Sequence, residues 1–168
     1  KNIDYKRKLD DLYDKASSIL PELPSFKEVL SMEVESIPFV FRQILIFINQ
    51  ISLVTAINKF GLQPSFMLGH SAGEVSMACI AGVLSENDAL MLIINRATYM
   101  ARNVASGSMI HCKGTVEFLN KLNVVKNHSA YIAVVNSESD VLLSCNTNNL
   151  PLVIKELDAL KVKHLVLN

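Results

Sequence analysis

The stretch Phe66-Met67-Leu68-Gly69-His70-Ser71-Ala72-Gly73-Glu74 decides the fold of this chain. An apolar run, expected as a strand over 65–68, leads into a Gly-x-Ser-x-Gly turn, and a helix-compatible segment over 74–81 follows at once. This order is typical of a nucleophile elbow, in which a tight turn lifts one serine above a sheet and a helix begins beneath it. We expect both Gly69 and Gly73 to be required, because the strained backbone beside the serine leaves no room for a side chain.

The motif makes Ser71 the candidate nucleophile of an acyl-transferring enzyme. The new helix would point its unpaired N–H groups at negative charge that develops on the substrate. A serine hydroxyl also needs a base, which is most often a histidine. The chain has four histidines, which are His70, His111, His128 and His164. His70 adjoins the serine across a sharp turn, and the other three lie in expected strands or a polar loop, so a structural role is the better interpretation for each.

Composition predicts a globular domain that leaves part of its apolar surface exposed. The 168 residues are enough to bury a core, half of them are hydrophobic, and the mean hydropathy is +0.30. We expect part of this apolar surface to face protein outside the chain. The longest apolar run, 39–57, is interrupted by Arg42, Gln43, Asn49 and Gln50. This predicts a buried helix rather than a membrane span.

Charge and cysteine content limit the class of partner. Sixteen basic and sixteen acidic residues cancel, so nothing indicates a nucleic-acid or anionic-membrane partner. The three cysteines show no paired spacing, which favours reduced thiols over disulfides or a metal site. We therefore expect a cytoplasmic protein.

Periodicity and turn residues divide the chain at about residue 106. Helices are expected over 4–19, 26–31, 39–59, 74–81 and 85–101, and only one strand, 65–68, precedes the division. After it we expect strands over 109–112, 131–135, 141–144 and 164–167, with helices over 116–122 and 150–160. The order βαββαβ is that of a ferredoxin-like domain. The sequence thus predicts an α/β fold in which 1–106 is part of a hydrolase-like large subdomain and 107–168 a complete small one.

Arg96 lies among apolar neighbours on the helix expected over 85–101, the second one after the elbow. It could be an ordinary exposed arginine at the helix edge. It could equally be a guanidinium fork that binds a carboxylate bidentately. Spacing alone leaves both alternatives open.

Several motifs together resemble the acyltransferase domain of polyketide and fatty acid synthases and the free-standing malonyl-CoA:acyl carrier protein transacylases. They are Gly69-His70-Ser71-Ala72-Gly73-Glu74, Ala81-Gly82-Val83-Leu84-Ser85, Asp88-Ala89, Arg96 ahead of Met100, Gly107-Ser108-Met109, the upstream Gln43 … Gln50 … Leu53 and Gly61-Leu62-Gln63-Pro64, and Val135-Asn136-Ser137 with Val141-Leu142-Leu143-Ser144. The resemblance runs from about Tyr5 to the end of the chain.

The resemblance implies roles for individual residues. Ser71 would take an acyl group from coenzyme A as an ester and pass it to the phosphopantetheine thiol of an acyl carrier protein. The Ala72 backbone N–H would be an oxyanion donor, and Arg96 would hold the free carboxylate of a malonyl-type unit. His70 and Asn136 would line the cleft between the subdomains, and Gln43 is placed with them among the substrate-binding residues by the matching upstream segment. No metal or organic cofactor is implied, and neighbouring synthase domains are expected partners.

The chain also departs from the family. Nothing resembles the Gly-Gln-Gly segment that opens the family's domain, and the family's histidine motif would follow the strand that here ends beside Asn168. We therefore expect an incomplete piece that lacks its general base and is inactive alone. Two alternatives remain open: a serine thioesterase or hydrolase of the α/β-hydrolase class, which would have no use for Arg96, and an inactive scaffold module of a synthase.

Overall fold

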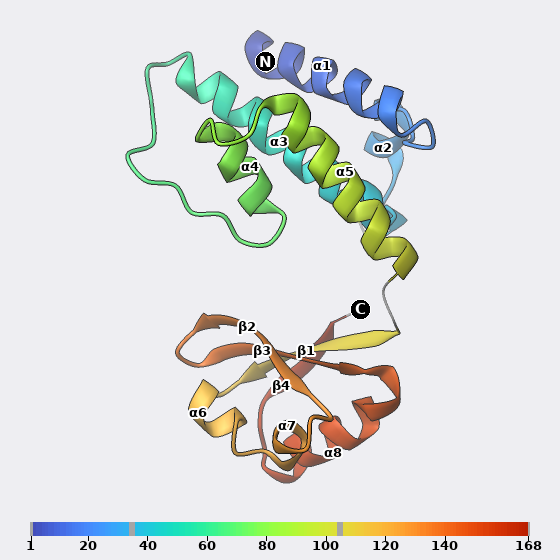
Figure 1. The fold of residues 1–168 in the computed structure, drawn as a ribbon, viewed down its shortest axis with the longest axis vertical. Helices are drawn as coiled ribbons and strands as arrows, with labels where there is room; N and C mark the ends of the chain where they lie inside the picture. The colour runs from blue at the N-terminus through green and yellow to red at the C-terminus, as the bar shows by residue number, and fades with distance from the viewer. Residues whose placement is uncertain (1, 34–35, 104–105, 168) are drawn as a thin grey trace. The chain divides into compact units, whose positions relative to one another are not determined.

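A computed structural model describes residues 2–33, 36–103 and 106–167 of the chain. It forms two compact units, Lys1–Asn103 and Val104–Asn168, and each is described by itself (Figure 1).

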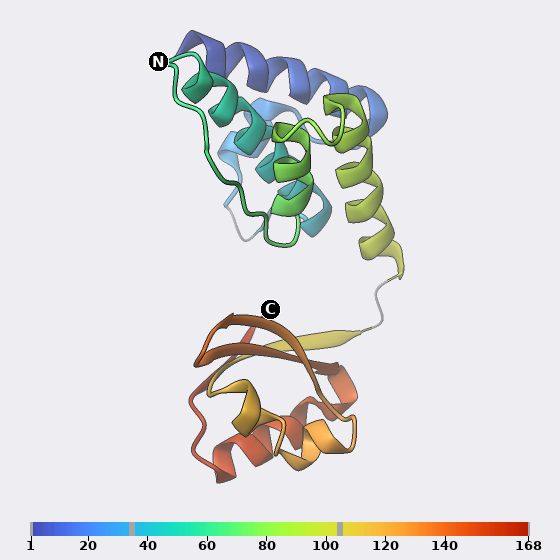
Figure 2. The same cartoon turned by 60° about the vertical axis from the view of Figure 1, so that its left-hand side comes forward.

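The first unit is built of helices. They are α1 (Ile3–Ile19), α2 (Phe26–Ser31), α3 (Phe39–Asn58), α4 (Gly73–Ile80) and α5 (Glu86–Asn103). Figures 1 and 2 show α1 and α5 lying along α3, which also contacts α4. All five expected helices are present, with ends that differ by at most two residues.

Side-chain caps fix where these helices begin. The Asn2 side chain accepts hydrogen bonds from the backbone N–H groups of Asp4 and Tyr5 at the start of α1. Ser85 Oγ accepts from the N–H of Asp88 at 3.1 Å at the start of α5, as the sequence predicts. Each cap satisfies N–H groups that the first turn of a helix leaves without a partner.

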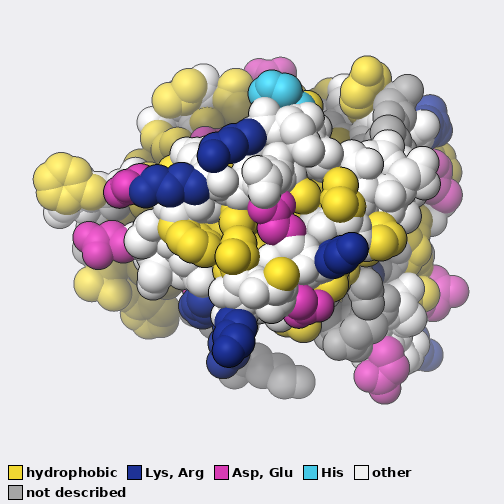
Figure 3. Space-filling model, turned by 90° about the horizontal axis from the view of Figure 1, so that it is seen from below, with side chains coloured by type: hydrophobic (Ala, Val, Ile, Leu, Met, Phe, Trp, Pro, Cys, Tyr) yellow, Lys and Arg dark blue, Asp and Glu magenta, His cyan; other side chains and the backbone are white. Residues whose placement is uncertain are grey.

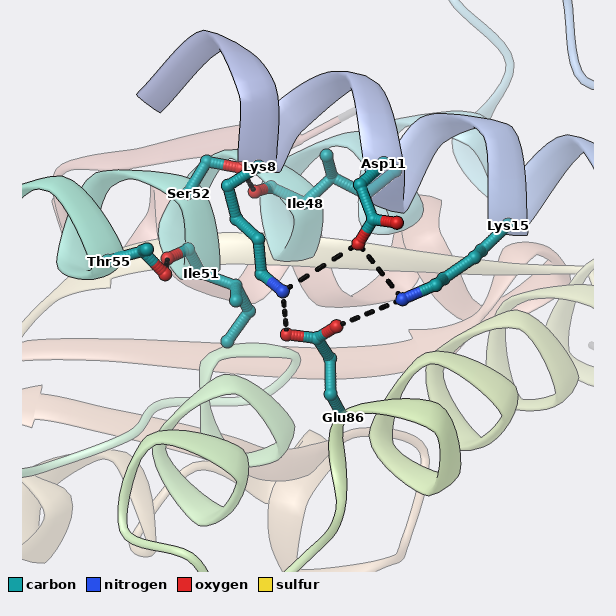
Figure 4. Close-up of polar contacts among 8 residues, drawn as sticks. All are labelled: Lys8, Asp11, Lys15, Ile48, Ile51, Ser52, Thr55 and Glu86. Carbon is teal, nitrogen blue, oxygen red and sulfur yellow. Dashed lines mark hydrogen bonds and ion pairs between the residues drawn. The ribbon is translucent and has the colours of Figure 1, made fainter. Parts of the chain in front are cut away.

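The core of the first unit gathers around α3. Its most deeply buried side chains are Leu12, Ile44, Phe47, Ile48, Leu90 and Ile93. Two polar side chains of α3, Gln43 and Ser52, are also buried, and the Ser52 hydroxyl donates to the carbonyl of Ile48 at 2.7 Å (Figure 4). This local bond removes the cost of burying the hydroxyl.

Helix α3 is more apolar than we inferred from the sequence. By length and composition it is one helix that could cross a membrane, with a mean hydropathy of 1.6 over an 18-residue window. The sequence analysis excluded a membrane span because polar residues interrupt the apolar run, and that exclusion was wrong. Its packing against α1, α4 and α5 confirms the expected core helix.

The expected strand over 65–68 is absent, and the described part of the first unit contains no strand. The segment is an irregular connection in which Phe66 and Leu68 are 95% and 97% exposed. A strand forms only when its backbone N–H and C=O groups pair with a neighbour, and the described residues of this unit supply none. The exposed apolar side chains agree with the expectation that some apolar surface would remain uncovered.

Four charged side chains link α1 to the first turn of α5 (Figure 4). Glu86 lies 2.5 Å from Lys8 Nζ and 3.4 Å from Lys15 Nζ, and Asp11 lies 2.9 Å from Lys15 Nζ. The hydrogen bond with Asp11 raises the pKa of Lys15 and lowers that of Asp11. Exposed pairs are worth at most about 1 kcal/mol each. The network therefore connects α1 to α5 without a large contribution to stability.

The second unit is a four-stranded antiparallel sheet with helices on one face (Figure 1). Its elements are β1 (Gly107–Lys113), α6 (Val116–Leu119), α7 (Asn123–Lys126), β2 (Tyr131–Ser137), β3 (Asp140–Asn146), the 3-10 turn η2 (Thr147–Asn149), α8 (Leu150–Ala159) and β4 (His164–Leu167). The strand order β2-β3-β1-β4 is that of a βαββαβ unit, so the ferredoxin-like prediction and the α/β class are confirmed.

The helix expected over 116–122 is shorter in the structure, where α6 ends at Leu119, and a second short helix that the sequence did not predict, α7, follows it. The backbone of Leu122 is extended, and the Glu156 carboxylate accepts hydrogen bonds from the N–H groups of Asn123 and Val124 at 2.8 and 2.9 Å. A capping carboxylate from α8 thus starts a helix at 123–126, where the sequence predicted none.

Alternation along the strands places the core of the second unit on the helix-covered face. Its members include Ile110, Cys112, Val141, Leu143, Cys145, Val153 and Leu157. Burial raises the pKa of the Cys112 thiol to about 11. This cysteine is therefore an inert member of the core.

The surface carries both signs of charge. On the face drawn in Figure 3, basic and acidic side chains are interspersed among hydrophobic ones. This agrees with the formal net charge of zero.

Candidate active site

Ser71 occupies a strained turn immediately before α4. Its φ is +52°, a left-handed conformation that residues other than glycine adopt rarely. The turn is closed by bonds from Gly73 N–H to the His70 carbonyl at 2.9 Å and from Glu74 N–H to the Ser71 carbonyl at 3.1 Å. Ser71 is exposed at this turn. Backbone strain of this kind is concentrated at functional sites.

The two glycines of the motif differ. A Cβ at Gly69 would lie 2.5 Å from Glu74 Cα and 2.7 Å from the Gly73 carbonyl oxygen, which are backbone atoms that cannot yield. A Cβ at Gly73 would meet no described atom within 4 Å. The expectation that both glycines are required is therefore supported at Gly69 and wrong at Gly73. The turn approaches the helix closely only on its Gly69 side.

Arg96 of α5 and Gln43 of α3 meet Ser71. Arg96 Nη2 donates to Ser71 Oγ at 3.3 Å, and Arg96 Nη1 donates to Gln43 Oε1. Of the two alternatives left open by the sequence, the arginine at the helix edge that only faces solvent does not fit these contacts. The role of Arg96 as a carboxylate ligand stays a prediction.

Helix packing explains why these side chains converge. On α5 the buried positions Ile93 and Ala97 face the core, and Arg96 lies at the edge of that face. On α3 Gln43 lies one turn before the buried Phe47, so the two side chains share the core face of the helix. Contact between α3 and α5 then brings the amide to the guanidinium.

The Ala72 N–H is placed to serve as a donor. The N–H groups of Gly73, Glu74 and Val75 are used in turn bonds, whereas that of Ala72 donates to none of the described residues. An unused N–H beside the nucleophile is what an oxyanion hole requires. Its catalytic role stays a prediction.

None of the histidines has the contacts of a general base in the described structure. His70 is exposed and makes no hydrogen bond to Ser71 within the described part of the first unit. In the second unit His111 Nε2 bonds Asp140 at 2.5 Å, His164 Nδ1 lies 2.9 Å from the Val162 carbonyl, and His128 stacks on Tyr131. These contacts agree with the structural roles expected from the sequence.

Asn136 lies on β2 of the second unit, where its side-chain nitrogen donates to Asp140 Oδ1 at 3.4 Å. Hydrogen bonds from Lys113 and then His111 lower the pKa of Asp140 to about 2. Asp140 is therefore an anionic acceptor at neutral pH. Sequence patterns did not single out this polar cluster, because its members come from three strands. Asn136 and Ser71 belong to different units, so a shared cleft stays a prediction.

A hollow in the first unit lies apart from the Ser71 site. It measures about 370 Å³ and is lined by Val54, Ile57, Asn58, Leu62, Gln63, Pro64, Met67 and Ile80. Neither Ser71 nor Arg96 lines it. Among the described residues there is also no group of three or more His, Cys, Asp or Glu side chains that could hold a metal ion.

Comparison with known proteins identifies the family. Residues 18–168 match the acyl transferase domain family model. A phenolphthiocerol synthesis polyketide synthase type I of Mycobacterium marinum is 36% identical over 105 residues, which are 62% of this chain and 5% of that protein. The chain thus spans less than a tenth of the length of the curated relatives it matches.

Solved structures share the fold. The acyltransferase domain from the second module of the salinomycin polyketide synthase has a TM-score of 0.85 at 23% identity, covering 99% of this chain and 38% of that one. The malonyl CoA-acyl carrier protein transacylase from Clostridium perfringens has a TM-score of 0.81 at 19% identity, covering 98% and 54%. With nine-tenths of its residues matched by the family model, the chain belongs to the acyl transferase domain family.

Proposed function

We propose that the protein containing this chain transfers a malonyl-type acyl group from coenzyme A, through an ester on Ser71, to the phosphopantetheine thiol of an acyl carrier protein. Family membership supports acyl transfer as the reaction. The observation that carries the choice of substrate is the Arg96 guanidinium 3.3 Å from Ser71 Oγ. A fixed cation beside the nucleophile favours an acyl group that itself carries a carboxylate.

In the first half-reaction, Ser71 Oγ attacks the thioester carbonyl and its proton passes to a general base. The carbonyl oxygen becomes an oxyanion, towards which the Ala72 N–H donates. Collapse of this intermediate breaks the C–S bond, forms the serine ester and releases coenzyme A, whose sulfur takes the proton. In the second half-reaction the carrier thiol attacks the ester in the same way and regenerates the Ser71 hydroxyl.

We further propose that the general base comes from polypeptide beyond these 168 residues and that the isolated chain is inactive. Two observations support this: His70 makes no hydrogen bond to Ser71 within the described first unit, and the chain covers 38% and 54% of the solved acyltransferases compared above. The acyl carrier protein and neighbouring synthase domains are the proposed partners, with no metal or organic cofactor, in the cytoplasm.

The test is covalent labelling. The full protein is incubated with radiolabelled malonyl-CoA, quenched in acid and mapped by mass spectrometry, and then chased with a carrier protein bearing phosphopantetheine. We expect label on Ser71 that moves to the carrier thiol. Release of free malonate without carrier labelling would indicate a thioesterase instead, and no label would indicate a scaffold module. Rapid stoichiometric labelling of the isolated 168-residue chain would contradict the missing base.

Replacing Gly69 should damage the turn, whereas replacing Gly73 should not. In Gly69→Ala the new Cβ meets the backbone of Glu74, so the turn must shift and carry Ser71 with it. Displacements of about 1 Å at a nucleophile cost roughly 10²-fold in rate. We expect a loss of that order in acyl transfer by the full protein. Gly73→Ala is the matched control, because its Cβ enters open space, and an equal loss in both variants would contradict this account.

A further inference from the structure

We propose that Gln43 is a positioning residue that sets the preference for a carboxylate-bearing acyl group by holding Arg96 in place without neutralising it. The inference rests on the function proposed above. It replaces the expectation that Gln43 binds substrate directly, because the contact that the structure shows for it is with Arg96.

The burial of Gln43 indicates a role other than stability. Its side chain is 5% exposed on the core face of α3, and Nε2 is buried without a hydrogen-bond partner among the described residues. An unsatisfied buried amide destabilises a fold, so an apolar side chain of the same size would pack here at less cost. The satisfied atom is Oε1, which accepts from Arg96 Nη1. The useful part of this side chain is therefore its oxygen.

The neutrality of the amide matters as much as its geometry. An aspartate or glutamate would also accept from Arg96, but its negative charge would pair with the guanidinium and compete with the substrate carboxylate. An apolar side chain would leave the long arginine side chain without an anchor. A glutamine fixes the guanidinium and leaves its full positive charge for the substrate.

Enough donors remain on Arg96 for this purpose. A guanidinium has five N–H donors, and the contacts with Gln43 Oε1 and Ser71 Oγ use two of them. Three remain, and a bidentate grip on a carboxylate needs two. One terminal nitrogen of the guanidinium, Nη1, bonds Gln43, and the other, Nη2, bonds Ser71. These two contacts fix the orientation of the guanidinium plane relative to the nucleophile.

The test compares kcat/KM for malonyl-CoA and acetyl-CoA in the full protein carrying Gln43→Glu or Gln43→Met. We expect Gln43→Met to lower kcat/KM for malonyl-CoA by about 10-fold or more, and Gln43→Glu to lower it further, with values for acetyl-CoA within about threefold of wild type. Gln50→Met is the matched control, because Gln50 lies two turns along α3 and its Oε1 is likewise buried without a hydrogen-bond partner among the described residues. It should change neither value.

The outcomes separate this inference from the proposed function. Equal losses for both substrates in the Gln43 variants, or a Gln43→Glu enzyme that keeps the wild-type preference for malonyl-CoA, would overturn the role of Gln43 and leave acyl transfer through Ser71 standing. A wild-type protein that never acylates Ser71 would overturn both. Thermal unfolding of each variant identifies any that fails to fold, and the two Gln43 substitutions give independent readings.

Discussion

Ser71→Ala should lower the rate of acyl transfer by about 10⁴-fold or more, the largest effect of any single change at this site. The variant removes the hydroxyl oxygen that forms the acyl ester in the proposed reaction, while keeping the turn bonds that close around residue 71. Alanine also fits the exposed position without a clash. Binding of the acyl-CoA should be retained.

The measurement is pre-steady-state acylation of the full protein by labelled malonyl-CoA, followed by intact-mass analysis. Ser65→Ala is the control, since Ser65 lies in the same exposed connection six residues earlier and forms no part of the proposed site. A Ser71→Ala protein that still carries the acyl mass at the wild-type rate would show that another residue is the nucleophile.

The sequence predicted the elements whose signals are local. Helical periodicity and the Ser85 cap found the helices of the first unit, and period-two alternation found the sheet of the second. Two elements depend on distant partners and were therefore predicted wrongly. An apolar run at 65–68 cannot show whether a neighbouring strand is present. The start of α7, which the sequence did not predict, depends on the carboxylate of Glu156, more than thirty residues further along the chain.

The same distinction holds for the site. Ser71 and the tight approach at Gly69 follow from a contiguous motif, so the sequence could find them. The contacts of Arg96 depend on how α5 packs against α3, which spacing cannot determine. The bond between Gln43 and Arg96 joins residues 53 apart in the chain, and only the fold reveals it.

Arg96→Ala should reduce kcat/KM for malonyl-CoA by about 10²-fold or more and leave acetyl-CoA nearly unaffected. Removing one partner of a buried, hydrogen-bonded charge pair costs roughly 2–5 kcal/mol, which corresponds to this range. Acetyl-CoA has no carboxylate to lose. Arg96→Lys should recover only part of the activity, because a point charge lacks the planar fork. Steady-state transfer to the carrier protein, with each acyl-CoA varied in turn, measures the effect.

The ratio between the two substrates also tests what Arg96 acts on. Its Nη2 donates to Ser71 Oγ, so the cation could instead stabilise the attacking oxygen. In that case malonyl-CoA and acetyl-CoA would lose the same factor, and the preference for a carboxylate would have to come from elsewhere. Arg102→Ala controls for the loss of a positive charge from α5, because Arg102 is an exposed residue of its last turn. A selective loss in Arg96→Ala, with Arg102→Ala unchanged, places the effect on the carboxylate of the acyl group rather than on the nucleophile or the net charge.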